Sequence, residues 1–257
     1  MQERRPLVLK EPLLFLFGRK VLLLTSVMKQ GLILSIETSG AACSVALSQG
    51  GSVVGTVTLD DSNRQSSMLV PAIESLFQKC SVQMSCCDAV AVSSGPGSYT
   101  GLRVGVSTAK GLCYGLGKPL IAVPTLEILR AEAMETEGCQ GASFYVPMLD
   151  ARRMEVYQAV YDPDGKIVEE VSAKVLDAAS YGDLLAKGQV VFIGTGAQKY
   201  RDAFAHPNGI YVPAAPKASF MAAAAQEAFN AGRFEDVAYF EPFYLKEFVA
   251  IVKKNPL

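Results

Sequence analysis

Short apolar runs separated by turn residues alternate along this chain with longer stretches in which apolar residues recur every three or four positions. The first pattern predicts strands and the second predicts helices. In the first half, the expected strands are residues 31–35, 43–47, 53–59, 89–92 and 120–123, and the expected helices are residues 66–79, 99–116 and 125–137. Three successive strands followed by alternating helices and strands are typical of an α/β fold.

The second half repeats this outline, although no repeat is visible residue by residue. Its expected strands are residues 144–149, 155–161, 167–171 and 190–193, and residues 218–231 are expected to be helical. Asp162 to Gly165 predicts a tight hairpin turn. The aromatic segment Tyr239 to Lys246 is expected to pack against the rest of the chain. Each half matches a ribonuclease H-like fold in outline, and we predict a first half at residues 28–125 and a reduced second half at residues 126–257.

Residues 1–27 have a different pattern from the rest of the chain. Two short apolar bursts, at residues 13–17 and 21–24, are separated by basic residues. Neither is long enough to cross a bilayer, and a secretory signal would need one uninterrupted apolar core followed by a small-residue cleavage site. We favour a leader from an over-extended start, with the working protein beginning at Met28, over a genuine targeting segment.

A glycine-rich turn, Gly95 to Gly101, joins the strand at residues 89–92 to the helix that follows. Such a turn can bind phosphate, because free N–H groups and the helix dipole point at the ligand. The G-x-G-x-x-x-G spacing here departs from the dinucleotide motif, and the sequence contains no G-x-x-x-x-G-K-[ST] loop. We therefore favour a turn that lets the helix pack closely, with Ser98 or Thr100 as its cap.

The helix after this turn contains two pairs of glycines four residues apart, Gly101 with Gly105 and Gly111 with Gly115. Glycine inside a helix costs about 0.5–1 kcal/mol relative to alanine, so a compensating contact is expected. Close packing against another helix, in this chain or in a partner, is the simplest such contact.

The helix at residues 66–79 has more apolar surface than one core contact needs. One stripe contains Leu69, Ile73, Leu76 and Phe77, and a second side adds Met68 and Ala72. Plain core packing and contact with a partner both explain the wider stripe.

Composition narrows the classes of function. A net charge of −1 provides no bulk attraction toward nucleic acid. The cysteines, which include the adjacent Cys86 and Cys87, form no C-x-x-C motif, so a reduced, cytoplasmic protein fits best. His206 is the only histidine, it lies in a predicted turn, and the sequence has no G-x-S-x-G motif, which disfavours metal or Ser-His-Asp catalysis by this chain.

Three segments together resemble a known family. They are Ile33 to Ser39, Ser94 to Leu112 and Asp150 to Tyr157. In order and spacing they look like the TsaB (YeaZ) family, the dimerization subunits of the bacterial complex that makes threonylcarbamoyladenosine in tRNA. The resemblance covers residues 28–257.

This resemblance implies an actin-like ATPase fold, with two ribonuclease H-like halves whose mixed sheets are flanked by helices. It also implies a catalytic sister subunit of the same fold, TsaD, which transfers the threonylcarbamoyl group to the adenosine next to the anticodon. A small ATPase, TsaE, joins the complex, and tRNA is reached indirectly through it. In such complexes the helices at residues 66–79 and 99–116 meet their counterparts on the sister subunit as a helical bundle.

The resemblance further predicts a non-catalytic scaffold without a metal or cofactor of its own. The catalytic sister carries a His-Leu-x-x-His pair just after the strand that is similar to residues 120–123, and an i, i+4 pair on one helical face suits metal ligation. This chain has Thr125 and Leu129 at those places, and neither side chain offers a nitrogen or a carboxylate.

The predicted partner interface lies on the two bundle helices and the turn between strand and helix. Its candidate residues are Met68, Leu69, Ala72, Gly97, Tyr99, Gly101, Arg103, Val104 and Gly105. Two alternatives stay open: an ATP-dependent phosphotransferase or metallopeptidase-like enzyme of the same fold, and a module that pairs with itself through the same helices when the sister is absent.

The charged segment that begins at Asp150 has two explanations. Strand alternation predicts that Asp150 and Arg152 share one face and that Arg153 and Glu155 share the other. They form either a charged edge that recruits a partner or tRNA, or cross-strand ion pairs on a solvated meander.

Overall fold

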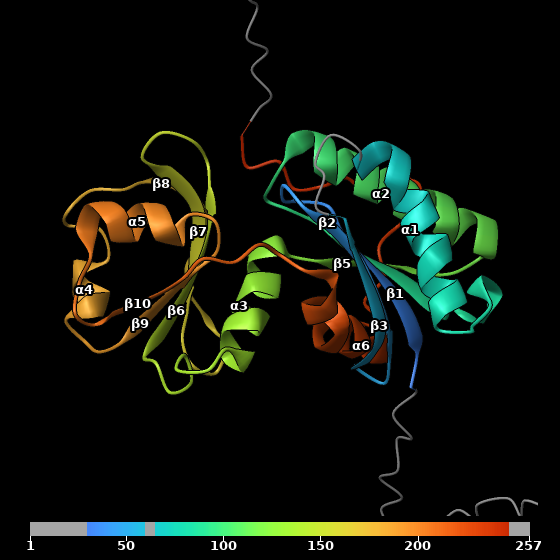
Figure 1. Cartoon of the computed structure of the whole chain (residues 1–257), viewed down its shortest axis with the longest axis horizontal. Coiled ribbons are helices and arrows are strands. Elements are labelled where there is room, and N and C mark those ends of the chain that lie inside the picture. Colours follow the sequence, from blue (N-terminus) through green and yellow to red (C-terminus); the bar gives the residue numbers. More distant parts are fainter. Residues whose placement is uncertain (1–29, 60–64, 247–257) are drawn as a thin grey trace, which may run out of the picture.

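The computed structural model describes residues 30–59 and 65–246, and it contains two five-stranded sheets that lie side by side (Figure 1). The first sheet has the order β3 (Ser52–Leu59), β2 (Cys43–Gln49), β1 (Leu32–Glu37), β4 (Ala89–Ser93) and β5 (Leu120–Val123). The second has the order β10 (Gly209–Val212), β9 (Val190–Ile193), β6 (Phe144–Asp150), β7 (Glu155–Tyr161) and β8 (Ile167–Val175).

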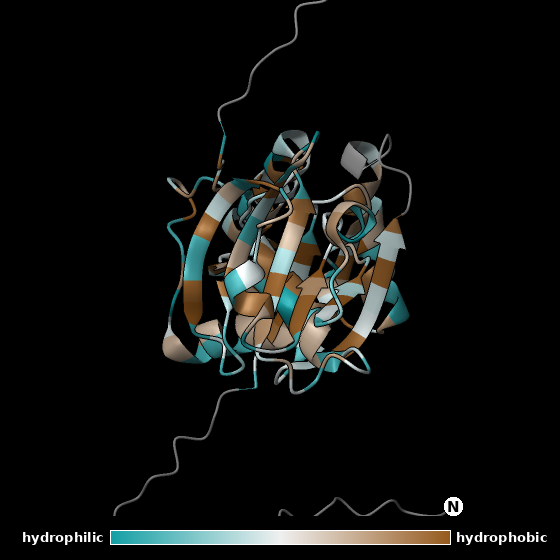
Figure 2. Cartoon of the chain, turned by 90° about the vertical axis from the view of Figure 1, so that its left-hand side faces the viewer, coloured by the Kyte–Doolittle hydropathy of each residue, from teal (hydrophilic) through white to brown (hydrophobic). Residues whose placement is uncertain are grey.

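Both sheets are mixed and follow the same plan. In each, a three-stranded antiparallel meander is extended by parallel strands, because β4 pairs parallel to β1 and β9 pairs parallel to β6. Figure 2, seen from the side of the second half, shows apolar and polar segments alternating along several strands. The predicted two-part mixed α/β architecture is confirmed.

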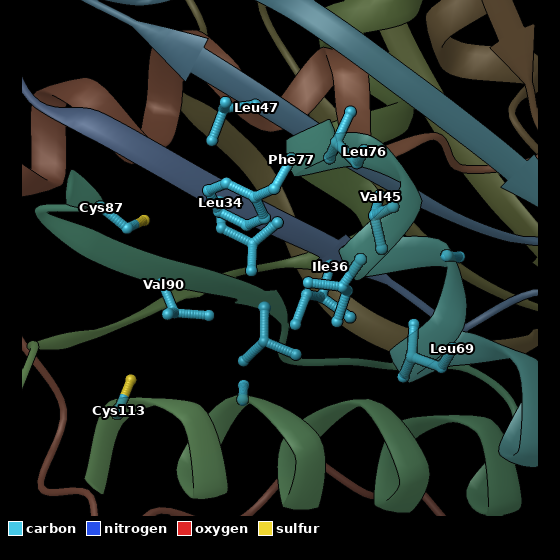
Figure 3. Close-up of a cluster of buried hydrophobic side chains, with 14 of the residues drawn as sticks. Leu34, Ile36, Val45, Leu47, Leu69, Leu76, Phe77, Cys87, Val90 and Cys113 are labelled. Carbon is cyan, nitrogen blue, oxygen red and sulfur yellow. The ribbon is translucent and has the colours of Figure 1, made fainter. Parts of the chain in front are cut away.

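Helices cover both faces of the first sheet. On one face, α1 (Gln65–Lys79) and α2 (Tyr99–Leu116) pack beside each other over a core that includes Leu34, Val45 and Leu76 (Figure 3). The other face is covered by η3 (Ala218–Met221) and α6 (Ala222–Ala231). Residues 218–231, late in the chain, therefore return to the first sheet.

The second sheet is covered by three helices. On one face, α3 (Thr125–Glu135) packs against β6 and β9. The other face carries α4 (Gly182–Leu185) and α5 (Ala197–Phe204), around a cluster of aromatic rings that includes Tyr181, Phe192 and Tyr200.

A short 3-10 helix, η2 (Met84–Cys86), precedes β4 in the first half.

All the strands and helices predicted from the apolar pattern are present, and their ends agree or differ by up to four residues. The hairpin turn at residues 162–165 is confirmed by a hydrogen bond from the Gly165 N–H to the Asp162 carbonyl, 3.1 Å. The pattern missed α4, α5 and β10, which are short. Short elements carry too few residues to show a period.

The prediction of a leader in residues 1–27 lies outside the described residues. Within the described part of the chain, no helix combines the length and the apolar character that a bilayer crossing requires.

Candidate functional site

The glycine-rich turn packs against the loop that follows β1. A β-carbon added at Gly97 would lie 2.6 Å from the Ser39 carbonyl oxygen, so only glycine allows this approach. The Ser98 N–H donates to that same carbonyl, 2.7 Å, and the Ser98 hydroxyl accepts from the Gly101 N–H, 3.2 Å. Ser98 therefore caps the helix, as predicted. Some backbone N–H groups of the turn already have hydrogen-bond partners within the chain.

The first glycine pair of α2 also faces this loop. A β-carbon at Gly101 would lie 2.0 Å from the Thr38 carbonyl oxygen, and one at Gly105 would lie 2.1 Å from the Thr38 hydroxyl oxygen. The compensating contact predicted for these glycines is therefore a loop of the same chain and not a second helix. Gly101 and Gly105 are buried, which removes them from any surface that a partner can reach.

Two predicted interface residues of α1 are likewise internal. Leu69 is fully buried and Ala72 is 5% exposed, and both belong to the core under the first sheet. Val104 on α2 is partly buried against the same core. Their side chains are therefore used within this chain, and both the interface residues and the use of the two helices as an interface stay predictions.

The surface that α2 does present is a different stripe, which we call the outer α2 face. It consists of the exposed residues Arg103, Ser107, Gly111, Tyr114 and Gly115. They recur at spacings of three and four, so they lie on one side of the helix. The Tyr114 side chain is 87% exposed, and β-carbons added at Gly111 or Gly115 would meet no described atom within 4 Å.

Tyr114 is not among the interface residues predicted from the sequence, although the sequence pattern of the helix could have identified it. It lies three residues after Gly111 and one before Gly115, on the side of the helix away from buried Cys113. An aromatic residue on the polar side of an amphipathic helix is the pattern to look for.

A hollow of about 570 Å³ borders the outer α2 face. It is lined by Gly111, Tyr114 and the segment Asp236 to Ala238. Lys110 holds this segment in place, because its ammonium group donates to the carbonyl oxygens of Ala238 and Phe240, both at 3.0 Å.

A buried polar cluster lies where β1 and β4 end. The Glu37 carboxylate oxygen Oε1 accepts from the Ser39 N–H and hydroxyl, both at 2.5 Å, while Oε2 has no hydrogen-bond partner in the described structure. Burial raises the pKa of the Glu37 carboxyl, although the hydrogen bonds from Ser39 oppose this effect. A raised pKa keeps the carboxyl protonated to higher pH than in water.

Thr125 and Leu129, which the family resemblance matches to the histidine pair of a TsaD-type subunit, follow β5, the strand that pairs with β4. Thr125 donates its N–H to the Gly95 carbonyl, 2.9 Å, and both Thr125 and Leu129 are fully buried. Within residues 30–59 and 65–246, no group of three or more His, Cys, Asp or Glu side chains is arranged to hold a metal ion.

The aromatic tail is docked, as predicted. The Phe243 N–H donates to the Ser94 carbonyl, 2.7 Å, and the Tyr244 ring lies 4.7 Å from the ring of Tyr99. Lys246 then forms an ion pair with Glu155 of β7. The tail therefore links the glycine-rich turn of the first half to the meander of the second, and predicted interface residue Tyr99 contacts this tail.

The segment after Asp150 differs from its prediction. Arg152 and Arg153 do not continue a strand, because both have left-handed backbones, with φ of 71° and 49°. They form the turn between β6 and β7, so strand alternation does not apply to them. Asp150 pairs with Lys199 of α5 and Glu155 pairs with Lys246, so neither ion pair is cross-strand.

The histidine and the two adjacent cysteines noted in the sequence are either exposed or disfavoured as reactive groups. His206 is exposed, and its Nδ1 accepts from the Asn208 N–H, 3.1 Å. Cys86 is exposed and Cys87 is buried, and both are free thiols. Burial raises the pKa of the Cys87 thiol, which disfavours its reactive thiolate form.

Two mixed five-stranded sheets, each built on an antiparallel meander and flanked by helices, place the chain in the actin-like ATPase fold class. Comparisons with known proteins narrow this class. A family model described as TsaD: tRNA N6-adenosine threonylcarbamoyltransferase matches residues 52–253.

Individual relatives define the family more closely. The tRNA threonylcarbamoyladenosine biosynthesis protein TsaB of Escherichia coli is 31% identical over 226 residues, which cover 85% of this chain and 96% of that protein. The solved structure of YeaZ from Pseudomonas aeruginosa superposes with a TM-score of 0.67 at 26% identity, over 84% of this chain and 100% of that one. The chain belongs to the TsaB (YeaZ) family.

The catalytic relatives are also similar, over a shorter stretch. A tRNA N6-adenosine threonylcarbamoyltransferase of Symbiobacterium thermophilum is 36% identical over 116 residues, which cover 39% of this chain and 34% of that protein.

Proposed function

We propose that the chain is a non-catalytic scaffold of tRNA threonylcarbamoyladenosine synthesis, and that it pairs with a TsaD-type catalytic subunit through the exposed faces of α1 and α2. The outer α2 face is the observation that carries the proposal. It combines a protruding aromatic side chain, Tyr114, with two glycines that leave the helix backbone open. Helices approach closely where small residues lie between larger ones, and aromatic residues anchor interfaces.

The neighbouring helix extends this surface. On α1, Val70 is 49% exposed and Glu74 is exposed, at a spacing of four residues. Because α1 and α2 pack beside each other, their exposed sides form one face on which a second helix pair can lie (Figure 1). A stable interface of standard size buries roughly 1,600 Å² in total, which a four-helix contact can supply.

The chemistry of the site supports the non-catalytic part of the proposal. Thr125 and Leu129 occupy the positions of the sister's metal-binding histidines, and the carboxyl group that ends β1, Glu37, is fully buried. A carboxyl with a raised pKa and no solvent access is a poor metal ligand. In the proposed complex the chemistry belongs to the sister subunit, a TsaE-type ATPase joins the pair in the cytoplasm, and tRNA is the shared substrate.

The first prediction tests the interface. Replacing Gly111 with leucine fills the open backbone of the outer α2 face, so a partner helix can no longer approach. We expect the affinity for the TsaD-type subunit to fall about tenfold or more, since overpacking costs about 1–3 kcal/mol. The measurement is co-elution in size-exclusion chromatography, followed by titration calorimetry.

A matched control is available in the second half. Gly182 of α4 also has open space around its missing side chain and an ordinary backbone, so Gly182→Leu adds the same bulk away from the proposed interface. It should bind the subunit as the unchanged protein does. Equal binding by Gly111→Leu and Gly182→Leu would contradict the interface.

The same samples separate the alternatives. Light scattering of the chain without its sister shows whether the outer α2 face also supports self-association, and Gly111→Leu should then reduce both kinds of pairing. Saturable ATP binding or ATP hydrolysis by the purified chain would contradict the non-catalytic assignment.

A further inference from the structure

The turn between β6 and β7 is held in a conformation that its residues disfavour. Arg152 and Arg153 both have left-handed backbones, which cost about 1 kcal/mol or more for each residue other than glycine. The turn runs from Ala151 to Met154, and left-handed positions in such turns are normally occupied by glycine, asparagine or aspartate. Two arginines at these positions are therefore unfavourable for the fold and point to a use for their side chains.

The turn is nevertheless well fixed. The Arg152 N–H donates to Asp150 Oδ1, 2.7 Å, and the Glu155 N–H donates to the Arg152 carbonyl, 3.1 Å. The Asp150 N–H is in turn held by the hydroxyl of Thr195, which follows β9, 2.9 Å. A turn that is ordered in advance presents its side chains with little further loss of entropy on binding.

The charges around the turn leave it positive. The two flanking acids are already paired, Asp150 with Lys199 and Glu155 with Lys246. Arg152 and Arg153 are exposed and form no ion pair within the described residues. In a chain with a net charge of −1, this turn is a local concentration of uncompensated positive charge.

We propose that the Arg152–Arg153 turn contacts the phosphodiester backbone of RNA. Guanidinium groups bind phosphate with two parallel hydrogen bonds, and such contacts position a nucleic acid without reading its sequence. Paired neighbouring acids lower the repulsion that a polyanion would otherwise meet. The inference rests on the proposed function, because it takes tRNA to reach this chain within the assembled complex.

The test compares two double variants. The first keeps the backbone shape of the turn but loses its positive charge, and the second keeps the positive charge. In R152N/R153G, the sequence Asn-Gly suits the left-handed backbone, so the fold should be retained or stabilised while two charges are lost. In R152K/R153K, the two charges remain. Binding of fluorescently labelled tRNA is measured by anisotropy at several salt concentrations, for the full chain alone and with its TsaD-type subunit.

We expect R152N/R153G to bind tRNA about tenfold or more weakly near 0.1 M salt. The slope of log affinity against log salt should become shallower by about 1.5 to 2, as for the loss of two phosphate contacts. R152K/R153K should keep most of the salt dependence of the unchanged protein. Thermal unfolding of each variant is recorded, and an equal or higher melting temperature for R152N/R153G shows that the loss of binding is not a loss of fold.

A matched control removes two charges elsewhere. Lys166 and Lys187 are exposed near the opposite end of the second sheet, where Phe144 of β6 pairs with Val190 of β9. K166Q/K187Q should bind tRNA as the unchanged protein does.

Three outcomes overturn the proposal. The first is an unchanged tRNA affinity and salt slope in R152N/R153G, and the second is an equal loss in K166Q/K187Q. The third is a loss of co-elution with the catalytic subunit at unchanged tRNA affinity, which would assign the turn to an acidic protein surface. Failure of the proposed interface would appear separately, as unchanged pairing of Gly111→Leu with the TsaD-type subunit, whatever the tRNA affinity of R152N/R153G.

Discussion

At the scale of single residues, Glu37 shows how burial changes the properties of a carboxyl group. It is the last residue of the core strand β1. In the structure it is fully buried, and its raised pKa reflects the loss of water more than any charged neighbour. The sequence shows where Glu37 lies along the strand, but burial depends on the helices that later cover it.

A pH-dependent stability follows from this raised pKa. Between the ordinary carboxyl pKa of 4.5 and the higher value in the fold, the folded protein holds a proton that the unfolded chain has lost. The Glu37 contribution to stability is therefore fully present below pH 4.5 and declines as the pH rises through that interval, by about 1.4 kcal/mol per pH unit crossed.

Glu37→Gln keeps a neutral group at this site, so its stability should fall less between pH 5 and pH 8 than that of the unchanged protein. The measurement is urea unfolding at several pH values across that range. An equal decline in the free energy of unfolding of the two proteins over this pH range would show that Glu37 is charged in the fold.

At the scale of elements, α2 has two glycine faces with opposite roles. Gly101 and Gly105 lie against Thr38, whereas Gly111 and Gly115 lie toward open space. The sequence shows two equivalent pairs of glycines at the same spacing. The spacing alone does not distinguish them, because the loop that selects the buried pair lies about sixty residues earlier in the chain.

Alanine substitutions should therefore have opposite signs along one helix. Gly101→Ala places a methyl group against the Thr38 backbone and should destabilise the fold by about 1–3 kcal/mol. Gly115→Ala meets no described atom within 4 Å and should stabilise it by about 0.5–1 kcal/mol. Urea unfolding of both variants checks this, and a shared sign would show that the two glycines have the same surroundings.

At the scale of the whole molecule, the chain passes between the two halves more than once. The chain leaves the first sheet through α3 and returns to it in η3 and α6, where Met221 and Ala225 cover the sheet face that contains Ile33. Lys217 of the returning segment also pairs with Glu132 of α3, 2.6 Å. The predicted boundary near residue 125 therefore separates the sheets along the chain, but the first sheet uses helices from both sides of it.

A fragment tests this dependence. Residues 28–125 alone leave uncovered the sheet face that η3 and α6 protect, so we expect the fragment to lack cooperative thermal unfolding by circular dichroism and to bind a hydrophobic dye. Adding a peptide of residues 213–246 should restore a cooperative transition. Cooperative unfolding of the fragment alone would show that the first sheet is stable without the returning helix.

The sequence by itself determined the order of the longer strands and helices, the two-part α/β plan and the family, because local periodicity and short motifs depend on neighbours along the chain. Only the tertiary structure decided which glycines of α2 are exposed, that Arg152 and Arg153 form a turn, and that Lys246 reaches Glu155. These features depend on contacts between segments far apart in the sequence. Since those contacts decide which side chains reach solvent, they also decide which surfaces are available to a partner or to RNA.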